Sequence, residues 1–147
     1  MTNMWENIKT VNIKLPMDVL KEFVESFNTT FAGKCDLQVY QKNQEVIRAY
    51  VNSVVGTRTD VQSEIVLKLE ADILHNYRLA VLTITYDISS VYPCKLVDNI
   101  NIMAYECGTS DELQEKIVET FRSEKFINSA SMIITQVDRE TANLVAG

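Results

Sequence analysis

The stretch YRLAVLTITYDI, residues 77–88, decides how this chain folds. Successive side chains of a β-strand point to opposite faces of the sheet. One set of alternate positions here reads Ala80, Leu82, Ile84, Tyr86 and Ile88, and the other reads Leu79, Val81, Thr83 and Thr85. Both sets are at least half apolar, and the β-branched and aromatic content is typical of strands. The pattern therefore predicts a central strand, covered on one face and partly covered on the other.

Five further strands are predicted from similar alternation. They cover residues 35–40, 45–55, 64–71, 92–97 and 100–106. The expected connections are a tight polar turn at 42–44, a loop at 56–60, a turn at 72–76 and a hairpin turn at Asp98-Asn99. Parallel neighbours need crossovers of a dozen or more residues. The short connections therefore predict an antiparallel meander of about six strands.

Helical patterns flank the predicted sheet. Residues 8–15 alternate as a half-buried strand, and Pro16 then suits the first position of a helix. The apolar face of that helix recurs at steps of three and four residues, and Gly33 ends it. The face comprises Leu20, Phe23, Val24, Phe27 and Phe31.

A second helical region follows the sheet. Thr109 and Glu112 form a capping box, in which each side chain satisfies backbone N–H groups at the helix start. The apolar stripe continues as far as Val137, either in one long helix or in two that meet near Ser123. Residues 138–147 are polar or small and are expected to fray. The predicted class is α+β, as a single domain over residues 1–147, with the order of elements found in helix-grip folds.

Composition excludes several classes of function. The net charge of −6, from 20 acidic and 14 basic residues, provides no basic surface for nucleic acid. No apolar run approaches the ~20 residues of a membrane span, so a membrane association is not predicted. Cys35, Cys94 and Cys107 form no CxxC pair, which favours free thiols in a reducing cytoplasm.

Candidate catalytic residues are few. The single histidine, His75, lies in a predicted turn, and buried thiols are poor nucleophiles. His75 and the cysteines have no metal-ligand spacing, and four glycines form no phosphate loop, so no metal or cofactor is predicted. An enzyme would need acids paired across the open sheet face. The candidates are Asp36, Glu64, Glu70 and Asp87.

The outer face of the predicted sheet is partly apolar and bordered by tyrosine and charge, which is typical of a recognition surface. The predicted binding residues are Tyr40, Tyr50, Val66, Lys68, Leu79, Val81, Thr83 and Thr85. Such a face would serve a partner protein, a homodimer that packs sheet against sheet, or the chain's own C-terminal tail.

Two functions are predicted from this pattern. The first is a non-catalytic protein-binding domain, such as an inhibitor, an immunity or antitoxin-like factor or a small adaptor, which self-associates and acts on a basic partner. The second is a carrier or sensor of a small apolar ligand, held in a cavity between a curved sheet and the C-terminal helix. Its lining would be Phe23, Phe27, Phe31, Tyr86, Met103 and Phe121.

Overall fold

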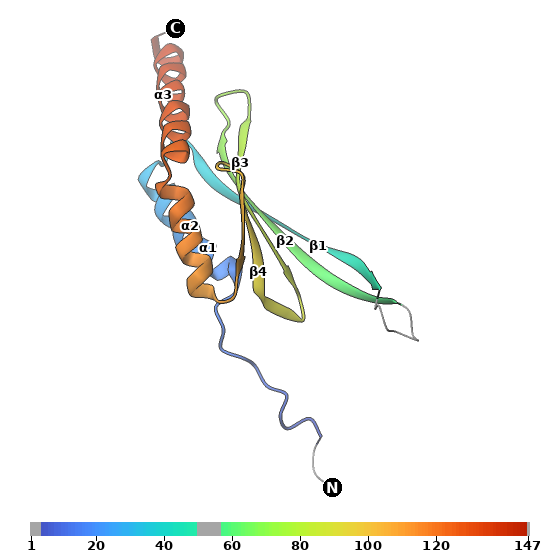
Figure 1. Cartoon of the computed structure of the whole chain (residues 1–147). Coiled ribbons are helices and arrows are strands. Elements are labelled where there is room, and N and C mark those ends of the chain that lie inside the picture. The colour runs from blue at the N-terminus through green and yellow to red at the C-terminus, as the bar shows by residue number, and fades with distance from the viewer. Residues whose placement is uncertain (1–3, 50–56, 147) are drawn as a thin grey trace.

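The chain folds into an α+β structure with one antiparallel sheet. A computed structural model describes residues 4–49 and 57–146 (Figure 1). The elements follow in the order α1 (Pro16–Thr30), β1 (Asp36–Ala49), β2 (Thr57–Ala71), β3 (Tyr77–Asp87), β4 (Ser90–Asp98), β5 (Met103–Cys107), α2 (Ser110–Arg122) and α3 (Glu124–Ala146). None of these helices is long and apolar enough to span a membrane.

The sheet is a meander in which every strand pairs with its neighbour in sequence, in the order β1-β2-β3-β4-β5. Over the described residues it has five strands rather than six, because β1 continues through residues 42–44, where the sequence predicts a turn. Lys42, Asn43 and Gln44 pair in register with Glu64, Ser63 and Gln62. The predicted loop at 56–60 is also wrong from Thr57 onward, because β2 begins there. Residues 50–55 of the predicted second strand lie outside the described residues.

A β-bulge in the β2–β3 ladder changes which side chains of β3 face the helices. Leu67 pairs with Leu82, but Lys68 pairs with Ala80, so Val81 is an extra residue. Beyond the bulge Leu79 lies opposite Leu69, and both belong to or contact the core. The alternation predicted from the sequence therefore holds only from Leu82 to Asp87.

The helix α1 forms where the sequence predicts it. Pro16 is its first residue, and the Asp18 carboxylate accepts a hydrogen bond of 3.1 Å from the backbone N–H of Leu15. The chain leaves the helix through Gly33, whose φ of +82° favours glycine. The predicted strand over residues 8–15 is wrong, because that segment forms no ladder with another strand and its residues 8–13 are exposed. Alternation of apolar and polar residues does not by itself show that a neighbouring strand is available for pairing.

The last hairpin and the C-terminal helices differ in detail from the prediction. Residues 99–102 form the turn after β4, and Ile102 has the positive φ of 57°. Thr109 caps α2 by accepting a bond from the N–H of Glu112, while Glu112 accepts from the N–H of Gly108 rather than from that of Thr109. The helices are two, with the break at Ser123, and α3 extends to Ala146.

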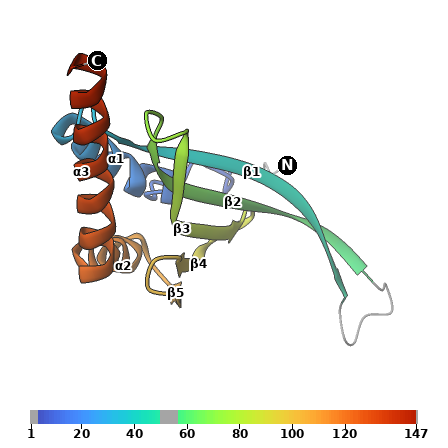
Figure 2. The same cartoon turned by 90° about the horizontal axis from the view of Figure 1, so that it is seen from above.

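All the helices of the described residues lie on one side of the sheet (Figures 1 and 2). Aromatic contacts join them, since the Phe121 ring of α2 stacks on Phe23 of α1 at 5.8 Å and meets Phe126 of α3 edge to face at 5.0 Å. The core between the helices and the sheet includes the fully buried Leu37, Ile65, Leu67, Leu82, Ile84, Leu96, Leu113 and Ile117. In α3 the buried residues end at Val137, so this helix contacts the sheet layer only with its first part.

Candidate functional site

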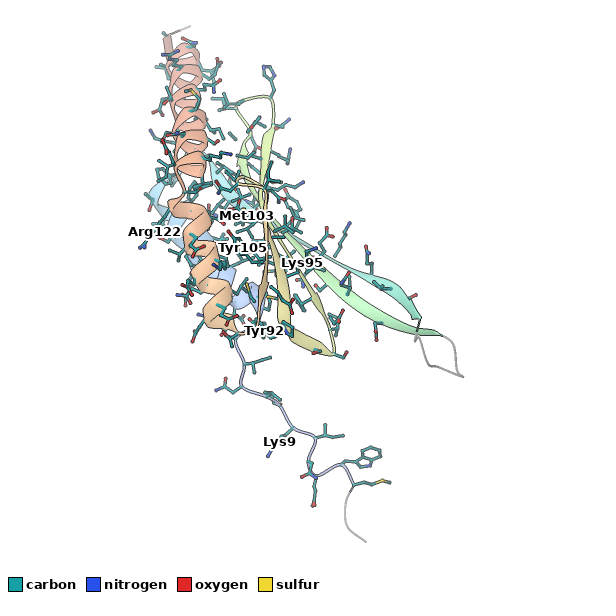
Figure 3. All side chains as sticks on the ribbon, viewed as in Figure 1. Lys9, Tyr92, Lys95, Met103, Tyr105 and Arg122 are labelled. Atoms are coloured by element: carbon teal, nitrogen blue, oxygen red, sulfur yellow. The ribbon has the colours of Figure 1, made fainter. Side chains whose placement is uncertain are left out.

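The face of the sheet opposite the helices, which we call the outer face, is the most extensive candidate site. In the described residues no helix lies over it (Figure 2). Lys95 on this face and Tyr105 on the helix side come from adjacent strands (Figure 3). Tyr105 contacts the ammonium group of Lys116 in α2, at 4.6 Å from the ring centroid. The outer face is therefore the side from which another molecule has direct access to the sheet.

An uncharged row crosses the outer face over all five strands. Register places Tyr40 beside Val66, Val66 beside Thr83, Thr83 beside Val97, and Val97 beside Ala104. Tyr40 is 44% exposed, and the other members of the row are exposed or partly exposed. We call these five residues the apolar row. Its small and apolar side chains leave a surface that a partner could cover without burying a charge.

A charged row runs beside the apolar row, two residues away along each strand. Lys42 pairs with Glu64, Glu64 with Thr85, Thr85 with Lys95, and Lys95 with Glu106. The Lys42 ammonium lies 3.7 Å from the Glu64 carboxylate, in an exposed ion pair. We call these five residues the charged row. Two positive and two negative charges give it a net charge of zero.

A hollow of about 650 Å³ opens near the charged row. Residues of β2, β3, β4 and β5 line it, including Gln62, Thr85, Lys95, Ala104 and Glu106. The short side chains of Thr85 and Ala104 leave space between longer neighbours. The hollow is thus part of the outer face and is accessible from solvent.

A polar cluster borders the other side of the apolar row. The Tyr40 hydroxyl donates to the Glu70 carboxylate, and the Arg78 guanidinium lies 3.4 Å from the same carboxylate. The pKa of Arg78 is raised by the hydrogen bond of its side chain with Tyr40 and by the negative charge of Glu70. The Lys68 ammonium lies 5.0 Å from the centroid of the Tyr40 ring. These contacts hold Tyr40 in place at the edge of the face.

The structure brings together most of the binding residues predicted from the sequence. Tyr40, Val66, Thr83 and Thr85 lie in the two rows, and Lys68 lies beside them. The placement of Leu79 and Val81 on this face is wrong: the bulge puts Leu79 opposite Leu69, and Val81 is fully buried in the core. Tyr50 lies outside the described residues.

Sequence reasoning missed the contributions of β4 and β5, which are Lys95, Val97, Ala104 and Glu106. The alternation within β4 was visible in the sequence, with Cys94 and Leu96 apolar and Lys95 between them. What the sequence did not reveal was the register, which alone places Val97 and Lys95 beside Thr83 and Thr85.

Of the groups that could perform catalysis, the structure brings together one pair of carboxylates, Asp36 and Glu70. His75 is exposed in the turn before β3, with a φ of 57°. Among the carboxylates considered from the sequence, Asp36 pairs with Glu70, whereas Glu64 and Asp87 lie further along the sheet. In the described part of the chain, no group of three His, Cys, Asp or Glu residues could hold a metal ion.

The three cysteines are free and buried. Cys94 and Cys107 lie opposite each other on β4 and β5. Burial, together with the neighbouring Cys107, raises the pKa of the Cys94 thiol to about 12. Burial is also the main cause that raises the pKa of Cys35 and of Cys107. Since the thiolate is the reactive form, these thiols are poor nucleophiles at neutral pH.

A second, smaller site is an aromatic groove of about 380 Å³ among the helices. It is lined by four of the six residues predicted to enclose an apolar ligand, namely Phe23, Phe27, Phe31 and Phe121. Tyr86 and Met103 do not line it. The groove therefore lies mainly between α1 and the C-terminal helices, with Leu37 of β1 also in its lining.

Comparison of the chain with protein-family models, with curated proteins and with solved structures finds no match.

Proposed function

We propose that this chain is a non-catalytic protein-binding domain that holds its partner on the outer face of the sheet. The observation that supports the proposal is the apolar row, which is uncharged across all five strands and lies open between a charged row and a polar cluster. Interfaces combine such an apolar centre with a polar rim. An open sheet face of this composition is otherwise a liability for aggregation.

An inhibitor, an immunity or antitoxin-like factor and a small adaptor are the kinds of protein that act in this way. Three free thiols suit a reducing compartment such as the cytoplasm. A basic partner would be attracted by the net charge of −6. Most of that charge lies on the helices, where ten acidic residues outnumber five basic ones, a net −5. Long-range attraction to the acidic helices would therefore add to docking at the outer face.

Site-specific crosslinking tests the proposal. A photoreactive amino acid at position 83, in the centre of the apolar row, is expected to give a discrete adduct with a protein in cells that express the chain. The matched control is position 114, because Gln114 is exposed on α2, on the opposite side of the molecule. Adducts at position 83 that are no more abundant or discrete than those at position 114 would argue against the outer face as a binding site.

The carrier of a small apolar ligand is the alternative, and the aromatic groove is the observation that favours it. Phe23, Phe27, Phe31 and Phe121 provide an apolar lining of the kind that ligand sites use. A ligand in this groove would leave the outer face free. The crosslinking experiment therefore separates the two functions, because a pure carrier gives no specific protein adduct from position 83.

A further inference from the structure

We infer that the partner on the outer face is a second copy of this chain. Each of the two rows on that face is complementary to the same row of another copy when the order of the strands is reversed. The inference rests on the proposed function but replaces the basic partner considered there with an acidic one, because a second copy carries the same net charge of −6. In the arrangement that we infer, a two-fold axis lies between the two facing sheets and runs along β3. The axis places β1 of one copy over β5 of the other, β2 over β4, and β3 over itself.

The charged row meets only opposite charges in this arrangement. Its order over β1 to β5 is Lys42, Glu64, Thr85, Lys95 and Glu106. Reversal places Lys42 over Glu106, Glu64 over Lys95, and Thr85 over Thr85. Each of the two charge pairs occurs twice, because the symmetry repeats every contact. Within this row no like charges face each other, so the row itself does not oppose docking of the face on its own copy. Beyond the row, the axis places Asp87, the next outer-face residue of β3, over its own copy.

The apolar row is matched at the same time. Val66 lies over Val97, Thr83 lies over Thr83, and the large Tyr40 lies over the small Ala104. Sheets that pack face to face lie about 10 Å apart and cross at roughly 30°. The match is therefore closest over β2, β3 and β4, where the crossing displaces the strands least.

A two-fold axis of another orientation, placed between the two rows, fits poorly. An axis perpendicular to the strands, between the two rows, would place each strand over itself and the apolar row over the charged row. Val66 would then cover Glu64, and Val97 would cover Lys95, which buries charges against apolar side chains. The neutral sum of the charged row also gives a basic partner little to recognise at this face. A second copy is the partner whose charges and apolar side chains fit in one arrangement.

Two charge reversals test the inference. Glu64→Lys places a positive charge opposite Lys95, and Lys95→Glu places a negative charge opposite Glu64, so each variant alone is expected to weaken self-association by about tenfold or more. An equimolar mixture of the two variants is expected to associate as the natural chain does. In a mixed dimer the introduced lysine of one variant faces the introduced glutamate of the other, and the unchanged Lys95 faces the unchanged Glu64. Sedimentation velocity over a range of concentrations measures all three samples.

Control variants carry the same charge changes away from the outer face. Glu115→Lys and Lys125→Glu change exposed residues of α2 and α3 and are expected to leave self-association unchanged. Thermal unfolding of each monomer shows whether loss of the Lys42–Glu64 pair affects folding, which is expected to be a small effect because the pair is exposed.

Three results would overturn the inference: a natural chain that stays monomeric at millimolar concentration, a mixture that associates no better than either variant, or control variants that weaken association equally. A specific adduct between position 83 and a different protein, together with a monomeric chain, would overturn the inference and leave the proposed function intact. Absence of both self-association and any adduct would contradict both.

Discussion

Replacement of Asp98 by alanine is expected to lower the free energy of unfolding by about 3–5 kcal/mol. Asp98 is 3% exposed and joins the end of β4 to the turn and to α2. One carboxyl oxygen accepts bonds of 2.9 Å from the backbone N–H groups of Ile100 and Asn101. The other accepts from the Asn101 side chain at 2.8 Å and from the Thr120 hydroxyl at 3.0 Å. Alanine would leave four donors without this acceptor, of which the Thr120 hydroxyl is buried and those of Ile100 and Asn101 are partly buried.

Urea denaturation of the purified variant measures this loss. Thr120→Val removes one of the four bonds and is expected to cost about 1–2 kcal/mol, while Glu115→Ala on the exposed side of α2 is expected to stay within about 0.5 kcal/mol. A loss below about 1 kcal/mol for Asp98→Ala would contradict the role of this carboxyl group in fixing the turn and α2.

Leu82→Ala is expected to destabilise the fold by about 2–5 kcal/mol, because truncation of a buried leucine removes apolar contacts and leaves a cavity. Leu82 has no exposed surface and lies opposite Leu67, directly beside the bulge. Thr83 is the matched control. It is adjacent in sequence but belongs to the outer face, so Thr83→Ala is expected to cost less than about 1 kcal/mol.

The same denaturation experiment compares the two neighbours. It is best performed at a protein concentration at which the chain is monomeric, since self-association would add to the stability of the natural chain. Equal losses for Leu82→Ala and Thr83→Ala would mean that both faces of β3 are covered, which would contradict an open outer face.

Most of the helices and strands could be predicted from the sequence because their signals are local. Apolar residues recur at three- and four-residue steps from Leu20 to Phe31 and indicate a helix. Pro16 marks where α1 begins, and Gly33 lies just beyond its end. Thr109 and Glu112 mark the start of α2 in the same way. The clean alternation in β2 follows from a strand with one buried face, since Ile65, Leu67 and Leu69 are fully buried.

The errors arise where the outcome depends on a distant part of the chain. Residues 8–15 alternate as well as some true strands do, yet no neighbouring strand pairs with them. Residues 42–44 look like a turn, but pairing with residues 62–64 keeps them in β1. The single extra residue, Val81, reverses the faces of everything before it in β3. A one-residue change of register moves each side chain to the opposite face, and no local pattern in the sequence predicts it.

The candidate site could be predicted only as a face, and not as an arrangement. The sequence indicated that Thr83, Thr85 and Val66 share a partly apolar surface, which the pairing of β2 with β3 confirms. The two rows, and hence their complementarity on reversal, depend on four separate pairings between strands. Only the structure gives all four at once.

Selective labelling in cells is the most direct test of whether another protein chain covers the outer face. Cysteine is introduced at Thr85 or, as the control, at Gln114, and both variants react with a membrane-permeant maleimide. The natural thiols are expected to stay unlabelled, because they are buried and burial raises their pKa. Position 85 is expected to react several-fold more slowly in cells than in dilute purified protein, while position 114 is expected to react equally in both. Equal reactivity of position 85 in cells and in dilute solution would contradict the covering of the outer face by another chain.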